Sequence, residues 1–186
     1  MKRQQWEEVL DVDLTGPVLI SHMLLPAMLE SGWGRIINIS SISGLFNSPF
    51  NGTYSIAKHA LESMTDVYRR ELRRYKIKVI AIEPGPIKTE IWKKNLNSMA
   101  PFAETDYNDV LKKANAMIEN AERTALPVVR ISNLLLKCIE GKNPKTRYIV
   151  HRNKLVFKLM AYYLPDKMVD WFIHKTLTST NKHRPI

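Results

Sequence analysis

Two short apolar strands, each preceded by a long helical segment, most constrain what this sequence can fold into. Residues 35–40 and 78–83 are rich in β-branched residues and end at serine or proline. Apolar side chains recur at helical spacing over residues 4–31 and again over 54–74. Helix, strand, helix, strand is the order of a parallel sheet with helical crossovers. The sequence therefore predicts an α/β fold.

The remaining segments extend this pattern within one domain. Gly16-Pro17 and Pro26 interrupt the first helical segment, which is therefore either one kinked helix or two consecutive helices. Residues 88–126 form a polar segment after the second strand. The further elements expected are helices over 107–123 and 127–141, a strand over 146–150, and an amphipathic helical tail over 154–177 that Pro165 breaks. Because no repeat or low-complexity linker divides the chain, a single domain over 1–186 is the simplest organisation.

Composition and charge argue against several kinds of protein. The net charge is +10, but the basic residues form no run and there is no ligand spacing of a zinc site. We therefore expect neither nucleic-acid binding nor a bound metal. Cys138 is the single cysteine, which fits a reducing compartment. The polar start is not a secretory signal, and no uninterrupted apolar run approaches the roughly 18 residues that span a bilayer. These features favour a cytoplasmic protein.

Tyr54 and Lys58 are candidates for a catalytic pair. Four residues apart on one expected helix, their side chains lie on the same face. A neighbouring ammonium stabilises a phenolate, which makes a tyrosine hydroxyl a usable general acid/base near neutral pH. Carbonyl reduction needs such a group, because hydride reaches the carbon while a proton must reach the oxygen. The spacing alone also fits a half-buried tyrosine beside a solvated lysine. The surrounding sequence motifs decide between this interpretation and a catalytic pair.

Two loops supply those neighbours. Ser41 leaves the first strand 13 residues before Tyr54, and residues 84–89 (PGPIKT) leave the second strand. Ligands of open α/β sheets bind at the carboxyl ends of the strands, where both loops are expected. Ser41 would offer a hydroxyl to the substrate oxygen that Tyr54 protonates. Gly85 would let the backbone approach a ligand closely, and Thr89 would offer a hydroxyl.

Together these motifs resemble the short-chain dehydrogenase/reductase family. Residues 34–44 (GRIINISSISG) are similar to its serine strand and loop, residues 54–61 (YSIAKHAL) to its catalytic helix, and residues 82–89 (IEPGPIKT) to its nicotinamide-side loop. The resemblance covers residues 4–150. It implies a Rossmann-like, doubly wound parallel sheet of three α/β/α layers, of which this chain is the C-terminal part.

The resemblance also implies roles for particular residues. Tyr54 would be the general acid/base, Lys58 would support it and hold the nicotinamide ribose, and Ser41 would orient the substrate oxygen. The cofactor would be NAD or NADP. The residues implied in binding its nicotinamide end are Tyr54, Lys58, Pro84, Gly85, Ile87 and Thr89.

Two departures from the family pattern qualify these roles. Residues 12–16 (VDLTG) resemble a segment that supplies a fourth catalytic residue, an asparagine that holds a water, but here the position is Asp13. Its carboxylate could pair with Lys58. The glycine-rich turn that binds cofactor phosphates is also missing, and the chain has only 7 glycines. We therefore expect a truncated chain, without roughly 80 to 100 residues of βαβ structure, that exposes an edge strand and an apolar face.

Substrate and partners follow from the variable regions. Segment 88–126 takes the place of the family's substrate-binding loop. Its apolar residues, which favour a hydrophobic alcohol or ketone, are Ile91, Trp92, Leu96, Met99 and Phe102. The basic and aromatic tail could lie weakly on a membrane surface, cap the pocket or fill a subunit interface. By resemblance, a homo-oligomer would form through the helix from Tyr54 to Arg74.

The leading hypothesis is an NAD(P)-dependent alcohol/carbonyl oxidoreductase. The alternative is a non-catalytic remnant or interaction module that keeps this part of the fold but cannot bind cofactor alone. Cofactor binding by the chain separates the two.

Overall fold

The computed structural model describes residues 2–91 and 108–178 of the chain. The chain divides into two compact units. Residues 1–85 and 129–157 form the first unit, and residues 86–128 and 158–186 belong to the second.

The first unit is built on a parallel sheet, as the sequence predicted. Its strands are β1 (Gly34–Ile39), β2 (Ile77–Pro84) and β3 (Arg147–Val150), in the order β1-β2-β3. Ile39 lies opposite Ile82, and Pro84 lies opposite Val150. The carboxyl ends of all three strands therefore meet at one edge of the sheet, which is where the expected site residues lie.

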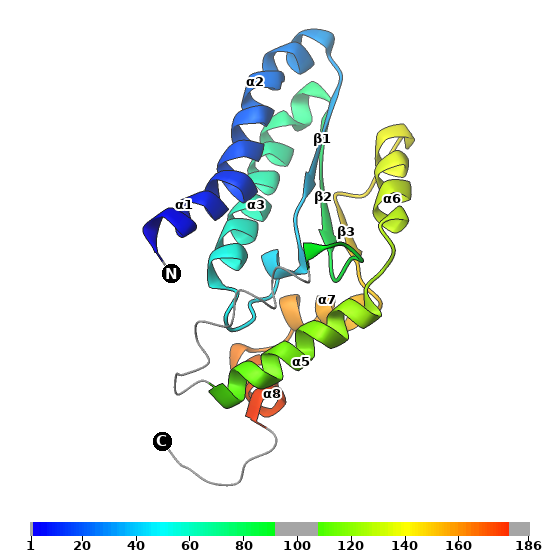
Figure 1. The fold of residues 1–186 in the computed structure, drawn as a ribbon. Helices are drawn as coiled ribbons and strands as arrows, with labels where there is room; N and C mark the ends of the chain where they lie inside the picture. Colours follow the sequence, from blue (N-terminus) through cyan, green and yellow to red (C-terminus); the bar gives the residue numbers. More distant parts are fainter. Residues whose placement is uncertain (1, 92–107, 179–186) are drawn as a thin grey trace. The chain divides into compact units, whose positions relative to one another are not determined.

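Helices cover both faces of this sheet (Figure 1). Against one face lie α2 (Gly16–Ser31) and α3 (Gly52–Glu71), and against the other lies α6 (Val129–Glu140). Side chains of β2 alternate between two apolar cores. Val79 packs with Ile36 and Leu72 on the α3 side, whereas Ile80 packs with Cys138 on the α6 side. The cysteine is free and fully buried, as expected for a small apolar residue.

The first helical segment is one continuous helix that contains a π-helical turn. Its parts are α1 (Arg3–Leu10), the π-helix η1 (Asp11–Thr15) and α2. At the end of η1 the Gly16 N–H donates to the carbonyl of Asp11, five residues earlier. Pro17 comes next and has no N–H to donate to a carbonyl of the preceding turn. The extra residue of the π-helical turn therefore lies where proline already removes one α-helical hydrogen bond. Of the two alternatives left by the sequence, the structure shows the single, perturbed helix.

This helix, Arg3–Ser31, has the length and apolar composition that would allow it to cross a membrane: it has 29 residues and contains an 18-residue window with a mean hydropathy of 1.4. Only 6% of its most apolar window is buried in the structure. Core helices of proteins that never enter a membrane can satisfy the same criterion, so the helix is weak evidence for a span.

The helix predicted over 127–141 and the strand predicted over 146–150 are present as α6 and β3. The first unit also contains two short 3₁₀-helices that were not predicted. The Ser41 loop contains the 3₁₀-helix η2 (Ile42–Gly44), and α3 ends in a second one, η3 (Leu72–Tyr75). A side chain at Gly44 would collide with the carbonyl of Lys58, so the glycine allows η2 to pack directly on α3.

One edge of the sheet is uncovered within the described residues. There β1 pairs only with β2, as expected, and Trp33 and Ile39 expose apolar surface beside it. An apolar groove of about 540 Å³ runs along the same edge, between α2 and Ile139 of α6.

The second unit contains α5 (Asn108–Thr124) and α8 (Asp166–Thr178), which contact each other. The residues of α7 (Lys154–Tyr162) are divided between the first unit, up to Phe157, and the second, from Lys158, and the helix ends before Pro165 as predicted. The N–H of Leu126 donates to the carbonyl of Pro86, and the carbonyl of Leu126 accepts from the N–H of Lys88. These two hydrogen bonds form a short parallel β-bridge between Leu126 and Ile87. Of the residues expected to line a substrate loop, Trp92, Leu96, Met99 and Phe102 lie outside the described residues.

Candidate active site

Tyr54 and Lys58 lie one turn apart on α3, a helix of 20 residues that packs against the sheet of the first unit. The side chain of Lys58 is only 9% exposed, which is unusual for a lysine. Its Nζ donates to the carbonyl of Ile39 at 3.2 Å and lies 5.6 Å from the centre of the Tyr54 ring. The lysine is therefore directed inward, beside the tyrosine, and is not solvated on the helix surface.

Asp13 supplies the countercharge. Its Oδ1 lies 3.0 Å from Lys58 Nζ, so the pairing considered from the sequence is present. Asp13 sits in the π-helical turn η1, and this turn contacts α3. A buried ammonium needs such a partner, because desolvation of an isolated charge costs several kcal/mol, on the order of 5.

Ser41 lies immediately after β1, where the chain leaves the sheet. Its hydroxyl accepts a hydrogen bond from the Ser43 N–H at 3.1 Å and lies 3.5 Å from the carbonyl of Pro84, to which it can donate. The backbone of Ser40 meanwhile pairs with the carbonyl of Ile82 at 2.8 Å. The two loops expected at the site therefore do meet at the carboxyl ends of β1 and β2.

The loop expected to bind the nicotinamide end, residues 84–89, is divided between the two units. Pro84 ends β2, and the Gly85 N–H donates to the carbonyl of Val150 at 3.0 Å, so both residues are fixed within the first unit. Ile87 and Thr89 belong to the second unit, where Thr89 is exposed. The structure thus brings together Asp13 with Lys58 and Tyr54, and Ser41 with Pro84.

The geometry fits the nicotinamide end of a dinucleotide. An ammonium has three N–H donors, and within the described residues two of those on Lys58 have oxygen partners. One donor remains for a ribose hydroxyl, next to the Tyr54 ring. Gly85 lies at the carboxyl end of β2, where a ligand of such a sheet is expected, and the side on which it lacks a Cβ is occupied by the ring of His151.

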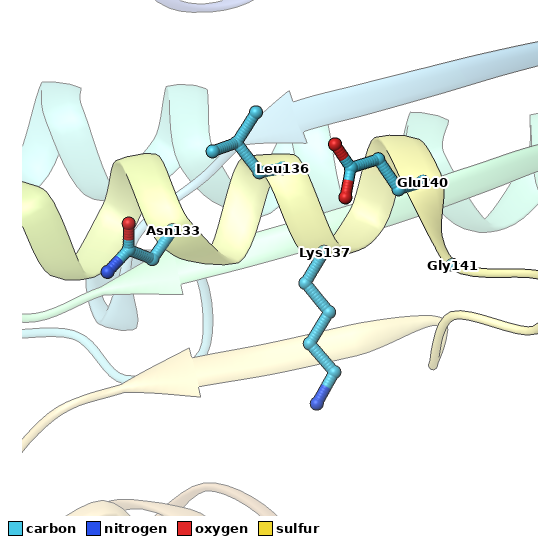
Figure 2. Close-up of a pocket in the computed structure, with 5 residues that line it drawn as sticks. All are labelled: Asn133, Leu136, Lys137, Glu140 and Gly141. Atoms are coloured by element: carbon cyan, nitrogen blue, oxygen red, sulfur yellow. The ribbon is translucent and has the colours of Figure 1, made fainter.

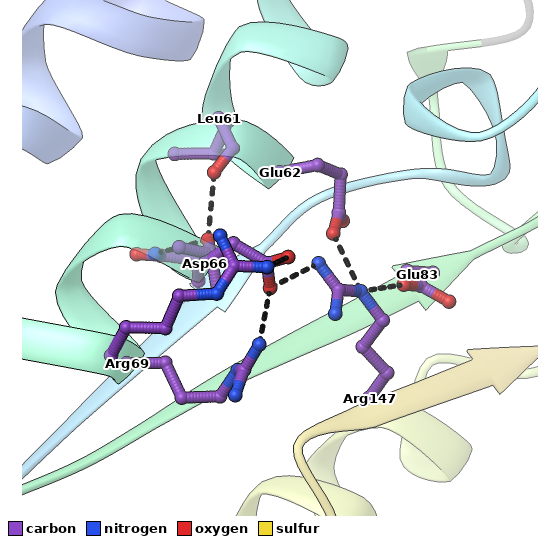
Figure 3. A network of polar contacts seen from close by, with 9 residues as sticks. Leu61, Glu62, Asp66, Arg69, Glu83 and Arg147 are labelled. Atoms are coloured by element: carbon purple, nitrogen blue, oxygen red, sulfur yellow. Dashed lines mark hydrogen bonds and ion pairs between the residues drawn. The ribbon is translucent and has the colours of Figure 1, made fainter. Parts of the chain in front are cut away.

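A buried ionic network lies under the same helix (Figure 3). Arg147 of β3 contacts Glu62 of α3 at 3.1 Å, Asp66 of α3 at 2.7 Å and Glu83 of β2 at 3.3 Å. The network therefore ties α3 to the ends of both neighbouring strands. Sequence reasoning passed over Glu83 and Arg147, although a carboxylate directly after the apolar run 79–82 and still within the strand was a usable signal.

The carboxylates of this network differ in charge state. Burial opposes ionisation of Asp66, but hydrogen bonds from Arg147 and Arg69 outweigh it and keep the pKa of Asp66 below its usual value. Glu83 is fully buried, and burial together with the negative charge of Glu62 raises its pKa to about 8. Glu83 is therefore protonated at neutral pH, and Arg147 balances Glu62 and Asp66.

The raised pKa of Glu83 predicts a pH-dependent stability. Between its ordinary value of 4.5 and about 8, the folded chain holds a proton that the unfolded chain releases. The free energy of unfolding should therefore fall as pH rises through this window, by about 1 kcal/mol per unit. Glu83→Gln, which mimics the protonated acid, should remove this slope.

Urea unfolding at pH 5.5, 6.5 and 7.5 measures the effect. Glu71→Gln, on the exposed end of α3, is the matched control and should keep the wild-type slope. Parallel slopes in the wild type and Glu83→Gln would show that Glu83 ionises normally.

A pocket of about 470 Å³ on α6 lies away from these residues (Figure 2). Its lining is confined to the outer part of this helix and the glycine after it: Asn133, Leu136, Lys137, Glu140 and Gly141. None of them is a candidate from the sequence, and the pocket is open to solvent.

Comparison with known proteins agrees with the geometry. A family model described as short chain dehydrogenase matches residues 1–100. An NADPH-dependent 3-dehydrocapnine reductase from Ornithobacterium rhinotracheale is 40% identical over 179 residues, which cover 94% of this chain and 62% of the relative. Retinol dehydrogenase 16 of Homo sapiens is 29% identical over 184 residues, which cover 91% of this chain and 56% of the relative.

Solved structures give the same picture for the fold. A short-chain dehydrogenase from Streptomyces avermitilis has a TM-score of 0.67 at 16% identity, and the match covers 98% of this chain and 64% of that chain. The chain spans about three fifths of the length of the curated relatives it matches.

Proposed function

The chain belongs to the short-chain dehydrogenase family, and from this premise we propose that it takes part in hydride transfer between NAD(H) or NADP(H) and a hydrophobic alcohol or ketone. The observation that carries the proposal is the buried Lys58 ammonium, held beside the Tyr54 ring by Ile39 and Asp13. Burying the charge of a lysine costs free energy. A lysine in such a position is therefore expected to contribute either to function or to stability.

In the proposed mechanism Tyr54 moves the proton. For a reduction, the Tyr54 hydroxyl protonates the substrate oxygen, and for an oxidation the phenolate accepts that proton. Lys58 stabilises the phenolate through its positive charge and offers its remaining N–H to the nicotinamide ribose. The bound nicotinamide supplies or accepts the hydride.

Ser41 and the loop after β2 orient the reactants. Ser41 holds the substrate oxygen within reach of Tyr54, while Pro84, Gly85, Ile87 and Thr89 contact the nicotinamide end. Asp13 takes the place of the family's asparagine. Its carboxylate fixes Lys58 directly, by an ion pair of 3.0 Å, where an amide would hold a water.

Names of relatives support the cofactor and substrate class. The Ornithobacterium relative is named as NADPH-dependent, which makes NADPH the first cofactor to test. The human relative is named for retinol, an apolar alcohol. The name of the human relative agrees with the proposed hydrophobic alcohol or ketone.

Cofactor titration tests the proposed function. We expect NADPH to bind the 186-residue chain, seen as a change in nucleotide fluorescence, and Lys58→Met to weaken that binding at least about tenfold because the ribose loses its ammonium donor. Lys76→Met, at an exposed position after α3, is the matched control and should bind like the wild type. Absence of binding by the wild type to NADPH and NADH would favour the alternative, a non-catalytic remnant or interaction module.

The exposed apolar surface supports the proposed assembly. On α2 the side chains of Leu19, Ile20 and Met23 are exposed, as are Ile56 and Val67 of α3. These exposed apolar side chains lie on α3, the helix expected to mediate contact between subunits, and on the neighbouring α2. Their exposure fits a homo-oligomer. The tail exposes Leu155 and Trp171, among other apolar residues, and this surface fits a weak membrane-surface association of a cytoplasmic protein.

A further inference from the structure

His151 lies beside the candidate site at the end of β3. It directly follows Val150, whose carbonyl accepts the Gly85 N–H at 3.0 Å. A methyl group added at Gly85 would collide with Cδ2 of His151 and would come within 3.1 Å of Cγ and 3.3 Å of Nε2. The imidazole therefore packs directly on the backbone of Gly85, and the glycine is required because His151 occupies the space of a side chain.

The imidazole is held in one orientation and one tautomer. Its Nδ1 lies 2.9 Å from the N–H of Asn153, so Nδ1 accepts this hydrogen bond and the proton of the neutral ring is on Nε2. The Phe157 ring packs edge-on against it, with centroids 4.3 Å apart and planes at 63°. Burial lowers the pKa of His151, which favours the neutral form further.

The contact extends to the Ser41 loop through aromatic packing. Phe157 also makes an edge contact with Phe46, at 6.2 Å between ring centroids. Phe46 lies two residues after η2, and its N–H donates to the carbonyl of Ile42 at 3.0 Å. His151 and Phe157 thus connect the two loops in which Ser41 and Gly85 lie, within one compact unit.

We propose that His151 is a positioning residue for the proposed dehydrogenase site: its imidazole packs on Gly85 and fixes the Pro84–Gly85 turn against which the nicotinamide end of the cofactor binds. The inference rests on the proposed function. It concerns the backbone of the turn, because His151 acts through Gly85.

A double-mutant cycle tests the contact without any need for activity. Gly85→Ala should lower the midpoint of thermal unfolding by about 3 to 10 °C, because the added methyl group displaces the imidazole. In the His151→Ala background the same substitution should change the midpoint by less than about 2 °C, because the space is then empty. Gly52→Ala is the matched control: a side chain there meets open space, so no loss is expected in either background.

NADPH titration then tests the positioning role. His151→Ala should raise both the dissociation constant and the KM for NADPH about five- to tenfold, with kcat changed less than about twofold, because the turn is less ordered before the cofactor binds. His151→Phe keeps a ring over Gly85 and removes both ring nitrogens. It should restore binding close to that of the wild type.

The outcomes separate the inference from the function on which it rests. An equal Gly85→Ala penalty in both His151 backgrounds would overturn the packing contact. Unchanged NADPH binding in His151→Ala would overturn the positioning role and leave the proposed function standing. If the wild type binds neither nucleotide, the proposed function fails together with the role of His151 in it, while the unfolding cycle still decides the contact.

Discussion

Tyr54→Phe should lower kcat about 10²- to 10⁴-fold while the dissociation constant for NADPH stays within about threefold of the wild type. The substitution removes only the hydroxyl oxygen, so the ring 5.6 Å from Lys58 Nζ and the packing of α3 are kept. Without the hydroxyl, water must protonate the substrate oxygen, and the phenolate that Lys58 would stabilise can no longer form. Turnover is measured by NADPH absorbance with a panel of hydrophobic ketones.

Tyr68→Phe is the matched control for this experiment. Tyr68 lies on the same helix but packs into the α2 side of the core, so its removal should leave kcat within about twofold. Retained turnover in Tyr54→Phe would refute the proton-transfer role. A parallel loss of NADPH binding would instead assign Tyr54 to cofactor binding alone.

Arg147→Met should cost about 3 to 5 kcal/mol of the free energy of unfolding at pH 7. The guanidinium contacts three carboxyl groups, and its loss leaves the buried Glu62 without a countercharge and deprives Asp66 of its 2.7 Å contact. Urea unfolding followed by circular dichroism measures the loss. Arg147→Lys keeps the charge and extends the measurement if Arg147→Met is too unstable to study.

Two further variants test whether the loss of stability comes from the buried ionic network. Arg70→Met removes another ion pair to Asp66, but Arg70 is 67% exposed, so its loss should cost less than about 1 kcal/mol. Adding Glu62→Gln to Arg147→Met should recover part of the stability, because it removes the uncompensated charge. Equal costs for Arg70→Met and Arg147→Met would show that the network contributes no more than a surface pair.

Local patterns were sufficient to predict the strands and most helices. The run 78–83 became β2 because its β-branched residues favour a buried strand and Pro84 ends it. Residues 54–74 became α3 and η3, and Pro165 separates α7 from α8. In each case the determining residues are neighbours in the chain.

The features that sequence reasoning missed depend on distant partners. Glu83 needs Arg147, which lies in another strand, and His151 needs Gly85, which follows the neighbouring strand β2. Periodicity shows which face of an element is apolar, but it does not show which segment will cover that face. For the same reason the separation of residues 86–128 from the first unit could not be read from the sequence.

The π-helical turn at Asp11–Thr15 has a consequence for the two helical parts that it joins. An extra residue in a turn offsets the side chains on either side of it by about 100° of rotation around the axis. Accordingly α1 contacts α3, whereas α2 contacts β1. The turn therefore rotates the contact face of α1 relative to that of α2, and Asp13 lies within this turn, from which its carboxylate reaches Lys58.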